Sequence, residues 1–274
     1  MNRRSFPLIA TLSALAAASS LLAADASLPD LALQPAHIVV APWKQHIPPT
    51  KRQGVAGIER TAKGRLWSVY GRDVESTRNF QVLKCSDDDG KTWSEVKLMI
   101  LPHSGTRAMS ANVWIDPLGR LWVFWGQSVD MQDGRFGVWA IVTDEPDKNE
   151  PKWSAPHRIG DGIMLNKPTV LANGDWLLTS SVWKADNSIK VYASTDKGKT
   201  WQGGLMLDER DGVTYPDGVQ AKDGTIYIVY DYHRTPEGVI HMATFGEEDV
   251  RAGKPVSDKV RLRELISRLP ETKP

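Results

Sequence analysis

The stretch KGRLWSVY at residues 63–70 places a glycine in a short turn directly before a run of β-prone side chains. The same arrangement recurs as LGRLWVFW at 118–125, NGDWLLTS at 173–180 and DGTIYIVY at 223–230. Successive glycines of this series are 55, 55 and 50 residues apart. A two-residue turn that contains glycine and lies between two β-rich runs is typical of a tight hairpin. The chain therefore repeats one hairpin four times.

Each repeat continues in the same way after its hairpin. A third β-rich run follows, and in two repeats it leads into a Ser-x-Asp-x-Gly-Lys-Thr-Trp element, SDDDGKTWS at 86–94 and STDKGKTWQ at 194–202. The second repeat keeps Thr143, Asp144 and Trp153 of this element around an insertion. A short fourth run comes next. Four short antiparallel strands repeated along a chain are the blades of a β-propeller.

A β-sandwich is the alternative fold, because it also contains many short strands. A sandwich does not require four hairpins in register with aromatic residues at matching offsets. The aromatic residues in question are Trp67, Trp122, Trp176 and, in the fourth place, Tyr227. We therefore predict an all-β propeller of four-stranded antiparallel blades with four clear blades, and a partial further one from PAHIVVAPW at 35–43.

The Ser-x-Asp-x-Gly element is interpreted as the turn between the third and fourth strands of a blade. Its Asp accepts hydrogen bonds from amides of its own turn, its Gly takes a positive φ, and its Trp packs between blades. A turn that is used once per blade is structural. We therefore do not expect catalysis from Asp89, Gly90, Trp93, Asp196, Gly198 or Trp201.

These elements resemble the Asp-boxes, or bacterial neuraminidase repeats, of the sialidase superfamily, at 86–93 and 194–201. The resemblance covers roughly residues 54–250, and DERDGVTYPDG at 208–218 has the character of secreted bacterial sialidase-like proteins. It implies a propeller that has six blades in sialidases, so this chain resembles a shortened member. It also implies a site with three arginines on the substrate carboxylate, a Tyr–Glu nucleophile pair and an Asp acid/base. The early Phe/Tyr-Arg-Ile-Pro motif of sialidases is absent, and GVAGIERTAKG at 54–64 takes its place.

The propeller geometry predicts where a site would lie. Residues before each first strand and after each second strand line one mouth of the central channel. Positions seven before the hairpin glycines are Gly57, Asn112, Lys167 and Asp217. Within TYPDG at 214–218, we expect Asp217 to act as general acid or base and Tyr215 as nucleophile or substrate contact. The alternative is a turn in which Pro216 and Gly218 set the shape and Asp217 is a cap.

Further candidates lie at the same mouth, except Glu59, which lies inside a first strand. Glu59 is either a channel-lining carboxylate, and then catalytic, or a partner of Arg60. Arg72 and Arg234 are suited to bind a carboxylate with two parallel hydrogen bonds. The alternative is that they are rim arginines in surface salt bridges. The remaining substrate-binding candidates are Asn166, Lys167, Gln127 and Asp231, with a solvated loop as the alternative for the first two.

The first residues predict export. Arg3 and Arg4 precede an apolar stretch that ends at Ala24-Asp25-Ala26, a small-x-small cleavage pattern. We expect a signal peptide over 1–26, hence a periplasmic or extracellular protein without stable membrane insertion after cleavage. The pattern fits Sec export, and the arginine pair also allows twin-arginine export.

Composition excludes several partners. The chain has 34 Lys and Arg against 33 Asp and Glu, so no net field favours nucleic acid. Its single cysteine, Cys85, cannot form an internal disulfide and is expected to be buried. The six histidines show no metal-ligand spacing, and we expect no metal and no cofactor. The sequence does not indicate an oligomeric state.

The predicted organisation has four parts: the signal peptide, a lead-in over 27–53 that includes a possible closing strand, blades over 54–254 and a helical tail over 255–274. EEDVRAG at 247–253 reads as a helical turn. The helix in the tail is predicted from an apolar stripe that ends at Pro270 and consists of Val260, Leu262, Leu265, Ile266 and Leu269.

Together these features predict a secreted sialidase-like glycoside hydrolase that acts on terminal acidic sugars of glycans. The alternative is a non-catalytic carbohydrate-binding propeller, or an inactive relative that lacks blades. The fold alone does not decide between them.

Overall fold

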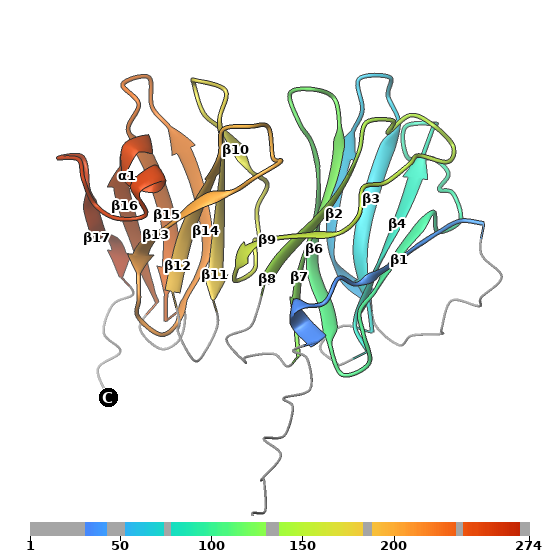
Figure 1. The fold of residues 1–274 in the computed structure, drawn as a ribbon, viewed down its shortest axis with the longest axis horizontal. Helices are drawn as coiled ribbons and strands as arrows, with labels where there is room; N and C mark the ends of the chain where they lie inside the picture. Colours follow the sequence, from blue (N-terminus) through green and yellow to red (C-terminus); the bar gives the residue numbers. More distant parts are fainter. Residues whose placement is uncertain are drawn as a thin grey trace, which may run out of the picture.

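The computed structural model describes residues 31–42, 53–73, 78–129, 137–182, 188–233 and 238–268. These residues form four antiparallel sheets, of which three have four strands and one has five, and one short α-helix (Figure 1). The all-β prediction is confirmed, and the sheets are the blades of a sialidase-like propeller. The predicted signal peptide and Arg234 lie outside the described residues.

Within every blade the strands pair in chain order. Blade 1 contains β2 (Gln53–Arg60), β3 (Leu66–Arg72), β4 (Phe80–Ser86) and β5 (Leu98–Leu101), with β1 (His37–Val40) added beside β5. Blade 2 contains β6 (Arg107–Ile115), β7 (Leu121–Ser128), β8 (Gly137–Thr143) and β9 (His157–Asp161). Blade 3 contains β10 (Thr169–Val170), β11 (Trp176–Val182), β12 (Ser188–Ser194) and β13 (Gln202–Asp208). Blade 4 contains β14 (Val213–Gln220), β15 (Ile226–Tyr232), β16 (Val239–Phe245) and β17 (Arg261–Arg268).

The hairpin glycines occupy the turns between the first and second strands, as predicted. Gly64, Gly119, Gly174 and Gly224 have φ values of 100°, 79°, 83° and 82°. This left-handed region is open to glycine at no steric cost, which explains why the residue recurs at each turn.

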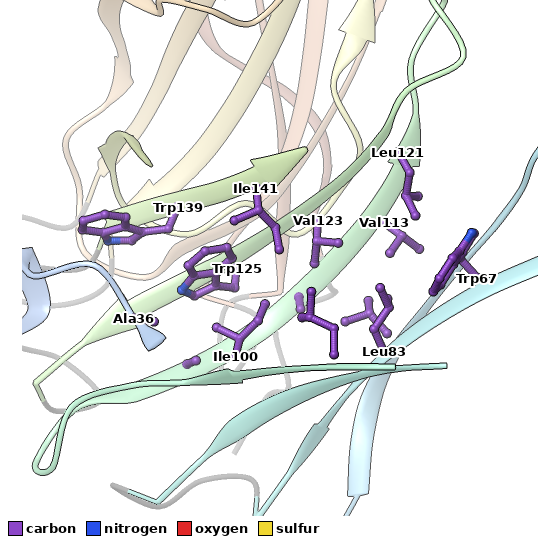
Figure 2. Close-up of a cluster of buried hydrophobic side chains, with 14 of the residues drawn as sticks. Ala36, Trp67, Leu83, Ile100, Val113, Leu121, Val123, Trp125, Trp139 and Ile141 are labelled. Atoms are coloured by element: carbon purple, nitrogen blue, oxygen red, sulfur yellow. The ribbon is translucent and has the colours of Figure 1, made fainter. Parts of the chain in front are cut away.

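The blades are held together by three apolar clusters between successive sheets. The first lies between blades 1 and 2, where Figure 2 shows Leu83 and Ile100 of blade 1 facing Val123 and Trp125 of blade 2. A second cluster joins blades 2 and 3 through Trp114, Trp122, Phe124 and Trp176, and a third joins blades 3 and 4. Each middle sheet therefore buries both of its faces, which is the largest stabilising contribution available to such a fold.

The two end blades stand apart. In Figure 1 the strands of blade 1 lie on the right and those of blade 4 on the left. Among the described residues, no strand of blade 4 makes an extensive contact with a strand of blade 1. The four blades thus form a row with two end faces, and the outer face of blade 4 exposes Val219 and Val229.

The two Ser-x-Asp-x-Gly turns have the same internal hydrogen bonds. In the first, Asp88 accepts from the amide and hydroxyl of Thr92 at 2.8 and 2.6 Å. In the second, Asp196 accepts from the amide and hydroxyl of Thr200 at the same distances. The structural interpretation of the element is therefore confirmed. One assignment was wrong: the turn aspartate of the first element is Asp88, and Asp89 occupies the following position with a φ of 55°.

The tryptophans of these elements do not all pack between blades. Trp153 packs against the cluster between blades 1 and 2, and Trp201 packs against the cluster between blades 2 and 3. Trp93 is 39 % exposed. Each of these tryptophans lies on the side of its blade that faces the preceding one. No blade precedes blade 1 in the described chain, so the prediction of interblade packing was wrong for Trp93.

Trp176 is also out of step with its predicted equivalents. Trp67 and Trp122 follow their hairpin glycines by three residues, whereas Trp176 follows Gly174 by two. Because strand side chains alternate, a shift of one residue reverses the face. Trp176 accordingly points back to blade 2, while Tyr227, at the position of Trp67, lies on the outer face of blade 4.

The lead-in forms a strand, but not a further blade. β1 pairs with β5 over His37–Val40 and Leu98–Leu101 and so becomes the outermost strand of blade 1. No described residue of the lead-in joins blade 4, so the predicted closing role was wrong.

The C-terminal region was predicted correctly only in part. The helical turn at 247–253 is present as α1 (Glu247–Ala252), which packs Val250 into the cluster between blades 3 and 4. The tail helix was wrong, because Arg261–Arg268 forms β17 along β16. The free hydrogen-bonding edge of β16 competes with a helix for this segment, and pairing with it satisfies backbone groups along the whole strand.

The asymmetry between Trp67 and Trp93 predicts different stabilities for two variants. Trp67 is fully buried, and its indole nitrogen donates to the carbonyl of Pro146 at 2.9 Å. Trp67→Ala is therefore expected to lower the free energy of unfolding by about 3–5 kcal/mol in chemical denaturation. Trp93→Ala is expected to lower it by less than about 1 kcal/mol. Equal losses in both variants would contradict the row arrangement, since Trp93 would then be buried by a neighbour.

Candidate functional site

Three innermost strands carry the same irregularity at the mouth. The pairing of β2 with β3 shifts between Gly54 and Gly57, that of β6 with β7 between Met109 and Asn112, and that of β14 with β15 between Thr214 and Asp217. Such bulges re-aim side chains and are frequent beside active sites. The predicted equivalence of positions 57, 112 and 217 is therefore present in the fold.

Each bulge holds a non-glycine residue in the left-handed region. Val55, Ser110 and Tyr215 have φ values of 52°, 48° and 52°. A positive φ is unfavourable for a β-branched or bulky side chain, and it persists only where flanking structure imposes it. Here the ladder hydrogen bonds on both sides of the bulge impose it. The mouth is consequently a preorganised, strained part of each blade.

Asn166 and Lys167 of blade 3 contact the innermost strands of blades 4 and 1. Lys167 Nζ lies 2.5 Å from Glu59 Oε1 and 3.1 Å from the carbonyl oxygen of Ile58 in blade 1. Asn166 Nδ2 donates to the carbonyl oxygen of Pro216 in blade 4 at 2.7 Å. Two adjacent side chains thus tie Glu59 to the segment that contains Tyr215 and Asp217. These contacts link the strands that carry the three predicted catalytic residues.

The Glu59 carboxylate faces a cation from another blade. Its side chain is 18 % exposed, and that of Lys167 is 42 % exposed. The guanidinium of Arg60 instead binds Asp89 at 3.0 Å at the far end of the blade, and only the backbone amide of Arg60 reaches Glu59. Of the two interpretations of Glu59, the channel-lining carboxylate fits this geometry.

Tyr215 and Asp217 are open to solvent. Tyr215 is 44 % exposed, and Asp217 is exposed beside it. One oxygen of Asp217 accepts from the amide of Gly218 at 2.9 Å, so the capping interpretation also holds. Asp217 lies opposite Val229, whose side chain is on the outer face of blade 4. Its carboxylate therefore belongs to the mouth and to the end face of the row.

The other predicted binding residues are distributed unevenly. Arg72 ends β3 opposite Gln53 and is partly buried at the mouth. Asp231 is 9 % exposed and accepts the hydroxyl of Thr214, so it braces β14. Gln127 is fully buried. Its amide nitrogen donates to Ala32 and Gln34 carbonyls at 3.0 and 2.6 Å, so it holds the N-terminal turn, and we do not propose it as a ligand contact.

Sequence reasoning missed a charged group beside the mouth. Asp208 is fully buried, receives two hydrogen bonds from Arg210 at 2.9 and 2.6 Å, and accepts the hydroxyl of Tyr230 at 2.9 Å. Burial alone would raise the pKa of Asp208, but these bonds hold it below its usual value. Burial, followed by the Asp208 charge, raises the pKa of Tyr230. This cluster joins β13 of blade 3 to β15 of blade 4. The Asp-Glu-Arg run at 208–210 was its only signal in the sequence.

A buried arginine was missed as well. Arg107 begins β6 at the mouth end and is 2 % exposed. Buried arginines require partners, and Arg107 has one. With Arg72, two arginines from adjacent blades lie at the mouth ends of their strands.

Two features are absent from the described part of the chain. Within it, no group of three or more His, Cys, Asp or Glu side chains is placed to hold a metal ion. No helix among the described residues is long and apolar enough to cross a membrane.

Comparisons with known proteins agree with the geometry at the level of the fold. No family model matches the chain, and no curated protein matches it. Among solved structures, the Hadza microbial sialidase Hz136 is 16 % identical with a TM-score of 0.57, over 78 % of this chain and 48 % of that one. A leech intramolecular trans-sialidase is 10 % identical with a TM-score of 0.56, over 81 % and 51 %. A protein of unknown function from Dyadobacter fermentans is 14 % identical with a TM-score of 0.56, over 78 % and 70 %.

These similarities show a sialidase-like fold. The chain spans about half the length of the two sialidase structures, 48 % and 51 %.

The bulge conformation leads to a prediction at Val55, which is 57 % exposed. Val55→Gly removes the unfavourable positive φ and little packing, so the free energy of unfolding is expected to stay equal or to rise by up to about 1 kcal/mol. The matched control is Val69→Gly in the next strand, where the side chain is fully buried and the loss should exceed about 2 kcal/mol. Urea denaturation measures both, and a clear loss in Val55→Gly would argue against the bulge.

Proposed function

We propose that the protein is an exported sialidase-like glycoside hydrolase that acts on terminal acidic sugars at the mouth of the blades. The observation that supports the proposal is a pair of contacts from adjacent residues: Lys167 binds the carboxylate of Glu59, and Asn166 binds the backbone carbonyl of Pro216, between Tyr215 and Asp217. A glycosidase needs two such groups on either side of the scissile bond, and a tyrosine nucleophile is the known sialidase exception. Export rests on the pattern at residues 1–26.

The cations of the site are suited to an acidic substrate. Lys167 is half exposed and already binds a carboxylate, that of Glu59. A sugar carboxylate offers the same chemistry, so it would compete with Glu59 for the ammonium group. Arg72 at the same mouth would supply planar, bidentate contacts. The leech trans-sialidase structure contains 2,7-anhydro-Neu5Ac, an acidic sugar, which supports this substrate class.

The proposed reaction assigns one role to each group. Tyr215 Oη attacks the anomeric carbon while Glu59, released from Lys167 by the substrate, accepts the phenolic proton. Asp217 in its acid form donates a proton to the departing glycosidic oxygen. Water then attacks the anomeric carbon, Asp217 accepts its proton, and Tyr215 leaves with the proton held by Glu59. General acid–base assistance of this kind contributes about 10²–10⁴ in rate.

A non-catalytic carbohydrate-binding role is the second candidate. One observation favours it: the early arginine motif of sialidases is absent from the sequence. The exposed position of Asp217 at the end face also leaves its carboxylate open on one side. A binding site needs the cations and aromatic surfaces of the mouth but not a positioned acid.

Asp217→Asn tests the catalytic proposal. The variant is expected to lose hydrolysis of sialosides by at least about 10²-fold, because Asn cannot donate a proton to the leaving oxygen. Its melting temperature should stay unchanged, since the side chain is exposed and Asn can still accept from Gly218. Activity should be measured on sialosides, uronate-bearing glycans and neutral glycosides.

The matched control is Asp89→Asn at the far end of blade 1. Asp89 is 74 % exposed and has a positive φ that Asn also tolerates. It should keep full activity. Unchanged turnover in Asp217→Asn would remove Asp217 from the mechanism, and saturable sialoside binding without any turnover in the unaltered protein would favour the binding role.

A further inference from the structure

A cavity lies between blades 2 and 3, at the end of the blades opposite the mouth. Its volume is about 420 Å³, within the range of small-molecule sites. It lies beside the hairpin turn of blade 2 and under the Ser-x-Asp-x-Gly turn of blade 3. Its main lining residues are Arg120, Trp122, His157, Lys197, Lys199 and Trp201. None of them belongs to the mouth described above.

The charge of this cavity is positive. Arg120, Arg158, Lys197 and Lys199 line it, and no Asp or Glu does. Asp116 balances Arg120 at 2.6 Å, and Asp161 balances Arg158 at 2.9 Å.

The two lysines are not balanced in this way. Lys197 Nζ donates to the uncharged carbonyl of Gly174. Lys199 is exposed and makes no ion pair with any residue that the structure describes. Asp196 of the same turn, which accepts from Thr200, offsets one of these charges, so the cavity keeps an excess of positive charge that attracts an anion.

Aromatic rings form the other walls. Trp122 is buried and meets His157 edge to face, with ring centroids 5.9 Å apart. The indole nitrogen of Trp201 and Nε2 of His157 are buried and have no hydrogen-bond partner among the described residues. Both atoms are shut off from solvent, so the wall that a ligand meets is the carbon surface of the partly exposed Trp201 ring, which suits the apolar face of a pyranose.

The walls are held rigidly. The buried carboxylate of Asp116 accepts Trp122 Nε1 at 2.8 Å and Arg120 Nε at 2.6 Å. The Arg120 guanidinium lies over the rings of Trp122 and Trp176, 5.2 and 5.5 Å from their centroids. At Gly198, a Cβ would come within 2.7 Å of both tryptophan rings, so only glycine allows the turn to approach this closely. A site fixed in this way loses little entropy on binding.

We propose that this cavity binds an anionic saccharide, a sugar-sized ligand that carries a carboxylate, sulfate or phosphate group. The lysines take the charged group, and the partly exposed ring of Trp201 takes the sugar ring. The site is separate from the mouth, and the proposal stands whether or not the mouth hydrolyses glycosides.

The repeat supplies a matched control. Lys91 occupies the position of Lys199 in the first Ser-x-Asp-x-Gly turn and is also exposed. No described blade precedes that turn, and its Trp93 is 39 % exposed, so the opposite wall that blade 2 gives the cavity is missing there among the described residues. Lys91→Gln therefore changes the same charge in the same local structure without a site.

The experiment is calorimetric titration of the full chain with glucuronate, glucose and inorganic sulfate at low ionic strength, with tryptophan fluorescence as a second readout. Glucuronate is expected to bind saturably and more tightly than glucose, with a change in tryptophan emission. Sulfate should compete with it. Lys199→Gln should weaken glucuronate binding by at least about fivefold, because it removes the unpaired cation, and Lys91→Gln should leave the affinity unchanged.

Lys167→Gln separates the two sites, because it removes a cation of the mouth and does not touch this cavity. Glucuronate binding that survives in Lys167→Gln and weakens in Lys199→Gln supports the proposal, even if the mouth proves inactive. The proposal is overturned by the absence of saturable binding, by equal affinity for glucose, or by a loss that follows Lys167→Gln and not Lys199→Gln.

Discussion

Burial of side chains between successive sheets is the constraint on which the rest of the structure depends. Because strand side chains alternate, each sheet has two faces, and both must be covered for full hydrophobic stabilisation. Trp67 covers the face toward blade 2, Trp122 the face toward blade 3, and Trp176 points back to blade 2. This packing sets the order of the blades and the line of the innermost strands, and so decides which residues meet at the mouth.

Local signals in the sequence were sufficient for the repeated units and insufficient where a segment had a choice of partners. The hairpin glycines predicted the turns because glycine adopts the positive φ of such a turn without steric cost, whatever its tertiary surroundings. The tail failed because Leu262, Leu265 and Ile266 are apolar in a pattern that a helix accepts, while the open edge of β16 is remote in sequence. The same reason applies to the lead-in, whose strand was predicted but whose partner, β5, was not.

In the candidate site, too, some features were predictable from local sequence and others were not. Counting back from the glycines predicted equivalent positions, and the three bulges lie there. The contact of Lys167 with Glu59 is not predictable from either segment, because it depends on which blades approach each other across the axis. Gln127 was misplaced for a related reason, since nothing near it in sequence shows that the N-terminal turn uses its amide. Arg107 and Asp208 escaped notice because a buried charge is distinguished by its partners and not by its neighbours in the chain.

The two ends of the blades use their backbones differently, and this difference separates the two proposed sites. At the mouth, bulges hold Val55, Ser110 and Tyr215 in unfavourable conformations, which presents side chains at the cost of stability. At the far end, the polar groups of the turn bind each other, so the turn alone does not form a binding site. A satisfied turn becomes part of a cavity only when a preceding blade supplies the opposite wall, as blade 2 does for Trp201 and nothing described does for Trp93. Function at that end is therefore a property of the junction between blades, and it cannot be assigned to the repeated element alone.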